Sequence, residues 1–160
     1  MNTVDAREQR ADLTISTPER LNEYRGPDIF IATAKDLDPE DFQKAKSLRV
    51  MEVFPKPFNS DALITKVAES LNSVPNQNTS PSIVIVDDDP DGRRLIALFL
   101  SNAIRGVIVH QFFSPQTAFE KIKEIKPNIV ITDIMLPEMS GWELTEKIQE
   151  WKKALVSRNS

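Results

Sequence analysis

Apolar and polar positions alternate along most of the chain in blocks typical of buried strands and amphipathic helices. Five short apolar runs predict strands, at 28–34, 50–54, 82–86, 106–112 and 128–133. Apolar residues at helical spacing predict five helices, at about 39–48, 60–71, 90–104, 115–125 and 142–154. Strict alternation of strand and helix predicts right-handed βαβ units, and hence an α/β fold whose parallel sheet is covered on both faces.

Several local patterns refine these elements. Asp38 precedes Pro39 at one predicted helix start, and Asn59 is the expected cap of the next helix. The helix at 90–104 is expected to bury a broad apolar stripe, made of Leu95, Ile96, Leu98, Phe99 and Leu100. His110 is the only histidine, and we expect it on an internal strand with a structural role. Trp142 is expected to pack near the carboxyl ends of the strands.

Two polar stretches suggest how the chain is divided. Residues 1–16 carry both charge signs and predict a flexible tail, followed by a short helix from Thr17 that Gly26-Pro27 ends. Residues 73–81, SVPNQNTSP, contain two prolines and predict a linker. The structured part is therefore expected as two segments, 17–72 and 82–156.

Composition narrows the class of protein. A chain of 160 residues with 40% hydrophobic and 28% charged content can bury one ordinary core. Its net charge of −4 argues against nucleic acid or an anionic membrane as the main partner. Without cysteine it can form no disulfide or thiolate metal site, and no apolar run reaches the roughly 20 residues of a membrane span. The N-terminus has no apolar signal region, so a cytoplasmic location is expected.

The residues at the strand ends carry the candidate chemistry. Asp87-Asp88 follows one predicted strand and Asp133 ends another, while Thr33 and Lys56 lie at the ends of the first two. In an open parallel sheet, ligands bind outside the carboxyl ends of the strands. Clustered carboxylates repel one another unless a cation such as Mg²⁺ binds them, and a nearby lysine and hydroxyl can hold a phosphoryl group. Each residue alone has a plain explanation, such as helix capping, but their joint placement favours a site.

The same segments resemble the receiver domain of two-component response regulators. IVIVDDDP is similar to the family's acidic first strand end, and IVITDIMLPEMSG to its phosphoacceptor strand and loop. IATA is similar to its threonine strand and FPKPF to its lysine loop. The resemblance covers roughly residues 28–155. It implies a flavodoxin-like, doubly wound five-stranded parallel sheet of order 2-1-3-4-5.

The resemblance also implies roles. Asp133 is the expected phosphoacceptor, and Thr33 and Lys56 are expected to contact the phosphoryl oxygens. The implied Mg²⁺ ligands are Asp87, Asp88, Asp133 and the backbone carbonyl of Met135. The expected donor is a phosphohistidine of a histidine kinase or phosphotransfer protein, and the only expected chemistry is self-catalysed phosphoryl transfer and hydrolysis. Because 160 residues leave little room for an output domain, we expect signalling through contact with a downstream protein.

The order of these motifs differs from the family pattern. In the family the acidic strand comes first and the lysine loop near the end, whereas here the Thr33 and Lys56 half precedes the half with Asp88 and Asp133. Three arrangements would explain this: a circular permutation, a domain-swapped homodimer, and two truncated receivers. Truncated receivers would expose strand edges, which disfavours them. Nine linker residues can span roughly 30 Å, so we favour a permutation, with the swapped dimer as its rival.

Departures from the family pattern leave functional alternatives open. Val53 stands where the family often has an aromatic switch residue, and its neighbour Phe54 is expected on the opposite face of the strand. Lys35 and Met135 flank the expected acceptor, and they are hypothesised to slow water entry. The alternative function is an interaction or assembly module that takes up no phosphate. A flavin or nucleotide carrier is disfavoured because no glycine-rich phosphate loop is present.

Overall fold

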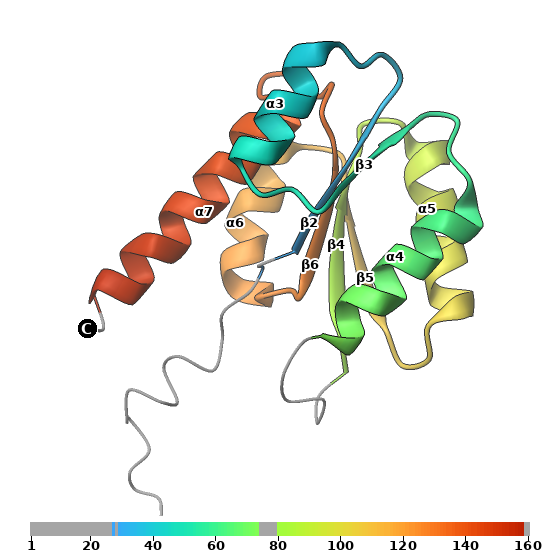
Figure 1. Ribbon diagram of the computed structural model, residues 1–160. Coiled ribbons are helices and arrows are strands. Elements are labelled where there is room, and N and C mark those ends of the chain that lie inside the picture. The colour runs from blue at the N-terminus through green and yellow to red at the C-terminus, as the bar shows by residue number, and fades with distance from the viewer. Residues whose placement is uncertain (1–26, 28, 74–79, 159–160) are drawn as a thin grey trace, which may run out of the picture.

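The structure is a computed structural model that describes residue 27 and residues 29–73 and 80–158 (Figure 1). The predicted tail at 1–16, the short helix expected at Thr17 and residues 74–79 of the predicted linker lie outside the described residues. The strands are β2 (Ile29–Ala34), β3 (Glu52–Pro55), β4 (Ser82–Val86), β5 (Ile108–Phe112) and β6 (Ile129–Asp133). The helices are α3 (Pro39–Ser47), α4 (Ser60–Asn72), α5 (Pro90–Ala103), α6 (Pro115–Ile125) and α7 (Gly141–Arg158).

The five strands form one parallel sheet with the order β3-β2-β6-β4-β5. When the strands are counted from β4 through β5 and β6 and then on to β2 and β3, the order from the β5 edge reads 2-1-3-4-5. The predicted flavodoxin-like α/β fold is therefore confirmed. Strands from the two halves of the chain meet at the centre, where β2 pairs with β6 from Ile29 opposite Ile129 to Thr33 opposite Asp133.

Helices cover both faces of the sheet because the strands are apolar on both faces. In Figure 1, α4 and α5 lie on one side of the sheet, and α6, α7 and α3 lie on the other. Alternate strand residues supply the two cores. The α4/α5 side buries Ile31, Leu63, Ile85, Leu100 and Ile131, and the α6/α7 side buries Phe30, Val84, Val130, Leu144 and Ile148.

The predicted helix starts at Asp38 and Asn59 are confirmed. Asp38 accepts a hydrogen bond from the backbone N–H of Asp41, and Asp41 in turn accepts one from the N–H of Asp38. Asn59 accepts a hydrogen bond from the N–H of Ala62. These side chains satisfy N–H groups that the first turn of a helix leaves unpaired.

Three expectations about elements were wrong. β5 is an edge strand, so His110 does not lie on an internal strand. In α5, Leu95 is 50% and Leu98 54% exposed, so the buried stripe is narrower than expected, because only one side of α5 faces the sheet. α7 continues beyond the predicted end at 154 to Arg158.

The expected orientation of β3 holds. Phe54 is buried in the core on the α4/α5 side, whereas Val53 packs on the opposite side near Ala32 and Trp142. Among the described residues, none of the helices combines the length and the apolar character that crossing a membrane requires.

Candidate functional site

The three aspartates that follow β4, residues 87–89, lie in three different environments. Asp87 is 1% exposed, and its Oδ1 accepts a hydrogen bond of 2.9 Å from the N–H of Asp89. Asp88 is exposed to solvent. Asp89 caps α5 by accepting from the N–H groups of Asp91 and Gly92. Helix capping therefore explains only the third carboxylate of the triplet.

Asp133 lies at the end of β6, beside the acidic turn. It is 8% exposed, and its Oδ1 accepts a hydrogen bond of 3.0 Å from the backbone N–H of Met135. The turn after β6 is held by the N–H of Ile134, which donates to the carbonyl of Thr33 at 2.9 Å. These bonds hold the carboxylate at the carboxyl edge of the sheet.

Lys56 joins the two groups of carboxylates. Its backbone N–H donates to the carbonyl of Ala34 at 2.7 Å, which places it directly after β3. Its Nζ lies 2.9 Å from Oδ2 of Asp87 and 3.0 Å from Oδ2 of Asp133. A cation from the first half of the chain thus bridges two carboxylates from the second half.

Burial and the neighbouring charges shift the pKa values of Lys56 and Asp133 for different reasons. Burial alone disfavours the charged ammonium, but the bonds to Asp87 and Asp133 outweigh it and raise the pKa of Lys56 above its usual value. Burial raises the pKa of Asp133, and the charge of Asp87 acts in the same direction. The N–H of Met135 and the ammonium of Lys56 oppose this rise in the pKa of Asp133 without cancelling it. A further positive charge near Asp133 would therefore stabilise its ionised carboxylate.

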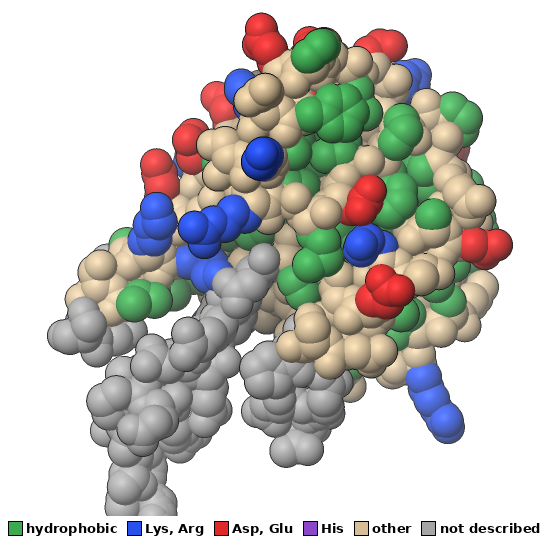
Figure 2. Space-filling view, viewed as in Figure 1, with side chains coloured by type: hydrophobic (Ala, Val, Ile, Leu, Met, Phe, Trp, Pro, Cys, Tyr) green, Lys and Arg blue, Asp and Glu red, His purple; other side chains and the backbone are tan. Residues whose placement is uncertain are grey.

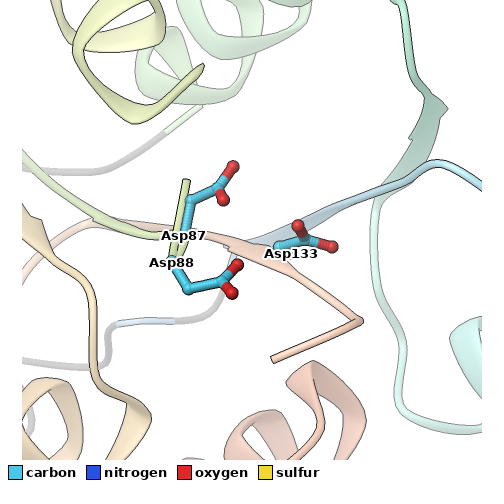
Figure 3. Close-up of side chains that lie close together, drawn as sticks. All are labelled: Asp87, Asp88 and Asp133. Atoms are coloured by element: carbon cyan, nitrogen blue, oxygen red, sulfur yellow. The ribbon is translucent and has the colours of Figure 1, made fainter. Parts of the chain in front are cut away.

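The acidic cluster has the composition of a divalent-cation site. Carboxylate oxygens of Asp87, Asp88 and Asp133 lie within 4.8 Å of one another (Figure 3). All three are hard oxygen donors, which Mg²⁺ prefers, and exposed Asp88 leaves a side open for waters. The raised pKa of Asp133 is what a cation bound there would reverse. The residues therefore fit Mg²⁺ by donor type and by charge.

The other predicted site residues lie near this cluster, with differing exposure. Thr33 is 1% exposed and is paired with Asp133 across the two central strands. Met135 is 63% exposed, and Lys35 is also exposed, so both flank the site at the surface. The contact of Thr33 with a phosphoryl group, the carbonyl ligand of Met135 and the effect of Lys35 on water entry stay predictions.

Two neighbouring contacts were not foreseen from the sequence. Nη1 of Arg93 donates to the backbone carbonyl of Asp87 at 2.8 Å and so braces the acidic turn. Nε1 of Trp142 donates to Oδ1 of Asp41 at 3.0 Å, although 101 residues separate them. The spacing of Asp38 and Asp41 could have indicated a capping box, but no local pattern indicates that Trp142 reaches it.

The second half of the chain is similar to known proteins. The model of the response regulator receiver domain matches residues 83–156. Hybrid signal transduction histidine kinase D of Dictyostelium discoideum is 34% identical over 74 residues, which are 46% of this chain and 5% of that protein. An uncharacterized 14.6 kDa protein of Leptolyngbya boryana is 34% identical over 71 residues, 44% of this chain and 53% of that protein.

A third relative is the transcriptional regulatory protein SrrA of Staphylococcus aureus, 34% identical over 77 residues, 48% of this chain and 31% of that protein. The chain thus spans about half or less of each of these three relatives. No solved structure matches the chain significantly. The segment with β2, β3 and Lys56 lies outside the family match, so its relation to the second half rests on the sheet and on the site.

Proposed function

We propose that both halves of the chain together form one phosphoacceptor receiver of two-component signalling, a proposal supported by the similarity of residues 83–156 to the response regulator receiver domain. In this proposal the segments 17–72 and 82–156 form a single domain in circularly permuted order, joined by the linker at 73–81. The observation that carries it is the bridge from Lys56 to Asp87 and Asp133. A receiver segment that ended at β6 and α7 would have the carboxylates without this cation.

Asp133 is the proposed acceptor of the phosphoryl group. Its carboxylate oxygen attacks phosphorus, and the bond from phosphorus to the donor nitrogen breaks, so that the imidazole of the donor keeps the bonding electron pair and takes up a proton. The hydrogen bond from Met135 and the charge of Lys56 favour the ionised form that this attack requires. The proposed donors are the phosphohistidine of a histidine kinase or phosphotransfer protein, and small phosphodonors.

The remaining residues stabilise charge. Asp87, Asp88, Asp133 and the carbonyl of Met135 would hold Mg²⁺, which supplies positive charge next to the phosphoryl oxygens. Lys56 exchanges its bond to Asp133 for one to a phosphoryl oxygen, because the charge it neutralises has moved there. Thr33 offers its hydroxyl to the same group from the neighbouring strand. The phosphorylated domain then signals through contact with a downstream protein.

The first test is intact mass after incubation with Mg²⁺ and acetyl phosphate. We expect wild type to take up one phosphoryl group, labile to hydroxylamine as an acyl phosphate is, and Asp133→Ala to take up none. The control is Asp91→Ala, which removes an exposed acid in the first turn of α5, outside the cluster, and should leave uptake unchanged. A folded wild-type chain that takes up no phosphoryl group would support the interaction module instead.

A further inference from the structure

Helix α3 is lightly packed and is held at both ends by α7. Ala45 is its only buried residue, and Phe42 is 55% exposed. Hydrophobic side chains show at the surface near α3 and β3 in the space-filling view (Figure 2). At one end of α3, Nε1 of Trp142 donates to Asp41, and at the other, Nε2 of Gln149 donates to the carbonyl of Leu48 at 2.6 Å. Besides the packing of Ala45 and Leu48 in the core, these two bonds connect α3 to α7.

The bond at Trp142 lies next to the proposed phosphoacceptor. Trp142 follows Gly141, whose N–H donates to the carbonyl of Ile134 at 3.0 Å. Gly141 is packed so closely against the chain after β6 that a Cβ there would lie 2.8 Å from Cα of Ile134. A movement of the loop after Asp133 therefore reaches the start of α7 directly.

The indole of Trp142 is suited to transmit that movement. It is 6% exposed and lies in one buried cluster with Ala32 of β2, Ala45 of α3 and Ile134 of the loop after β6. Its partner is ionised: the backbone N–H of Asp38, and after it the indole of Trp142, lower the pKa of Asp41 below its usual value. A hydrogen bond to a charged acceptor is stronger than one between neutral groups.

We propose that Trp142 is a positioning residue that fixes the N-terminal end of α3 through its hydrogen bond to Asp41. We propose further that this hydrogen bond changes with the conformation of the loop that follows Asp133. The second part rests on the proposed function. In this arrangement the Gln149 bond holds the far end of α3 in both states, while the Trp142 bond decides where the end with Asp38 and Asp41 lies. The surface that α3 offers a partner, including exposed Phe42, then depends on the site.

The positioning role is tested without phosphate. Amide hydrogen exchange of residues 40–47 is measured in wild type, Trp142→Phe, Asp41→Ala and the double variant. Trp142→Phe keeps an aromatic ring but removes the N–H donor and part of the buried ring, so we expect about tenfold faster exchange. Asp41→Ala also breaks the capping box, but that loss is common to both arms of the double-mutant cycle, which isolates the bond itself. Additive effects of the two substitutions would overturn the positioning role.

The link to the site is tested by fluorescence in a Trp151→Phe background, where Trp142 is the only tryptophan. We expect acetyl phosphate with Mg²⁺ to shift the Trp142 emission, the shift to disappear in Asp133→Ala, and Asp41→Ala to abolish or strongly reduce it. Gln149→Ala is the matched control, because it removes the bond at the far end of α3 and should keep the shift.

The outcomes separate the two proposals. Phosphoryl uptake seen by mass with an unchanged Trp142 emission would overturn the link and leave the proposed function intact. No uptake would overturn the proposed function together with the link. In that case the double-mutant cycle measured by hydrogen exchange still decides whether Trp142 positions α3, because it gives the coupling between Trp142 and Asp41.

Discussion

At the scale of single residues, identical side chains act differently because their positions in the turn differ. Three consecutive aspartates follow β4, yet one is buried against Lys56, one is exposed and one caps α5. The aliphatic run before them supplies the buried strand that brings the first carboxylate into the protein. Lys56 is what makes this burial tolerable without a metal ion, since it neutralises part of the charge.

Lys56→Met should therefore destabilise the chain in the absence of Mg²⁺. The carboxylates of Asp87 and Asp133 would face each other without a cation, and we expect the free energy of unfolding to fall by about 1–3 kcal/mol. Because Lys56 also opposes the rise in the pKa of Asp133, that pKa should rise further. Urea denaturation with and without Mg²⁺ measures the effect, and the ion should stabilise the variant more than wild type.

The matched control is Lys66→Met. Lys66 lies 3.6 Å from Glu52 in a pair that is much more exposed than the Lys56 pair. Exposed ion pairs contribute about 0–1 kcal/mol, so this variant should unfold nearly as wild type does and respond to Mg²⁺ in the same way. Equal stability of the Lys56 and Lys66 variants would contradict the importance of the bridge.

At the scale of elements, α7 is seated directly against the end of β6. The contact depends on the absence of a side chain at Gly141, since a Cβ there would collide with the carbonyl oxygen of Asp133. The same element then reaches α3 through Trp142 and Gln149. One helix thus connects the acceptor strand to a lightly packed helix from the other half of the chain.

Gly141→Ala should disturb this seating. The three nearest neighbours of the new Cβ are all backbone atoms, which cannot rotate away, so the start of α7 or the end of β6 must shift. We expect a loss of about 1–3 kcal/mol in the free energy of unfolding, measured by urea denaturation, and slower phosphoryl uptake at Asp133.

Gly92→Ala serves for comparison. Its Cβ would lie 3.0 Å from Oδ2 of Asp89, a side-chain atom that can give way more easily than backbone, and Gly92 lies within α5. Alanine favours the helix by up to about 1 kcal/mol over glycine, so this variant should be close to neutral. If Gly141→Ala were as well tolerated, the close contact between α7 and the end of β6 would contribute neither to stability nor to phosphoryl uptake.

At the scale of the whole molecule, the two halves meet at the most buried part of the sheet. All residues of β2 and all of β6 are buried, and their pairing forms the seam. Either half alone would expose the edge and faces of a central strand, which favours association of the halves. In Figure 1, α4 ends and β4 begins at the same end of the sheet, so one chain can supply both halves.

A mixing experiment distinguishes the closed chain from a domain-swapped dimer. Lys56→Ala and Asp133→Ala chains are unfolded together, refolded and tested for phosphoryl uptake. In a closed chain every site carries one substitution, so we expect uptake no faster than with the Lys56→Ala chain alone. In a swapped dimer one of the two sites of each mixed dimer would be intact, so a fraction of the chains would take up a phosphoryl group at the wild-type rate. Each variant refolded separately is the reference.

The sequence by itself determined the elements and the residues at the strand ends. Hydrophobic periodicity and capping residues such as Asp38 and Asn59 act over a few residues, so local patterns predict where helices and strands lie. The placement of Asp87, Asp133, Thr33 and Lys56 at carboxyl ends follows from the alternation alone. These parts of the prediction needed no knowledge of which strands are neighbours.

Only the tertiary structure decided which groups meet. The bridge from Lys56 to Asp133 spans 77 residues, and the bond from Trp142 to Asp41 spans 101, so neither leaves a local pattern. The edge position of His110 and the exposure of Leu95 depend on which faces of β5 and α5 are covered. Contacts of this kind are set by how the whole sheet assembles, because packing joins segments that the chain itself keeps far apart.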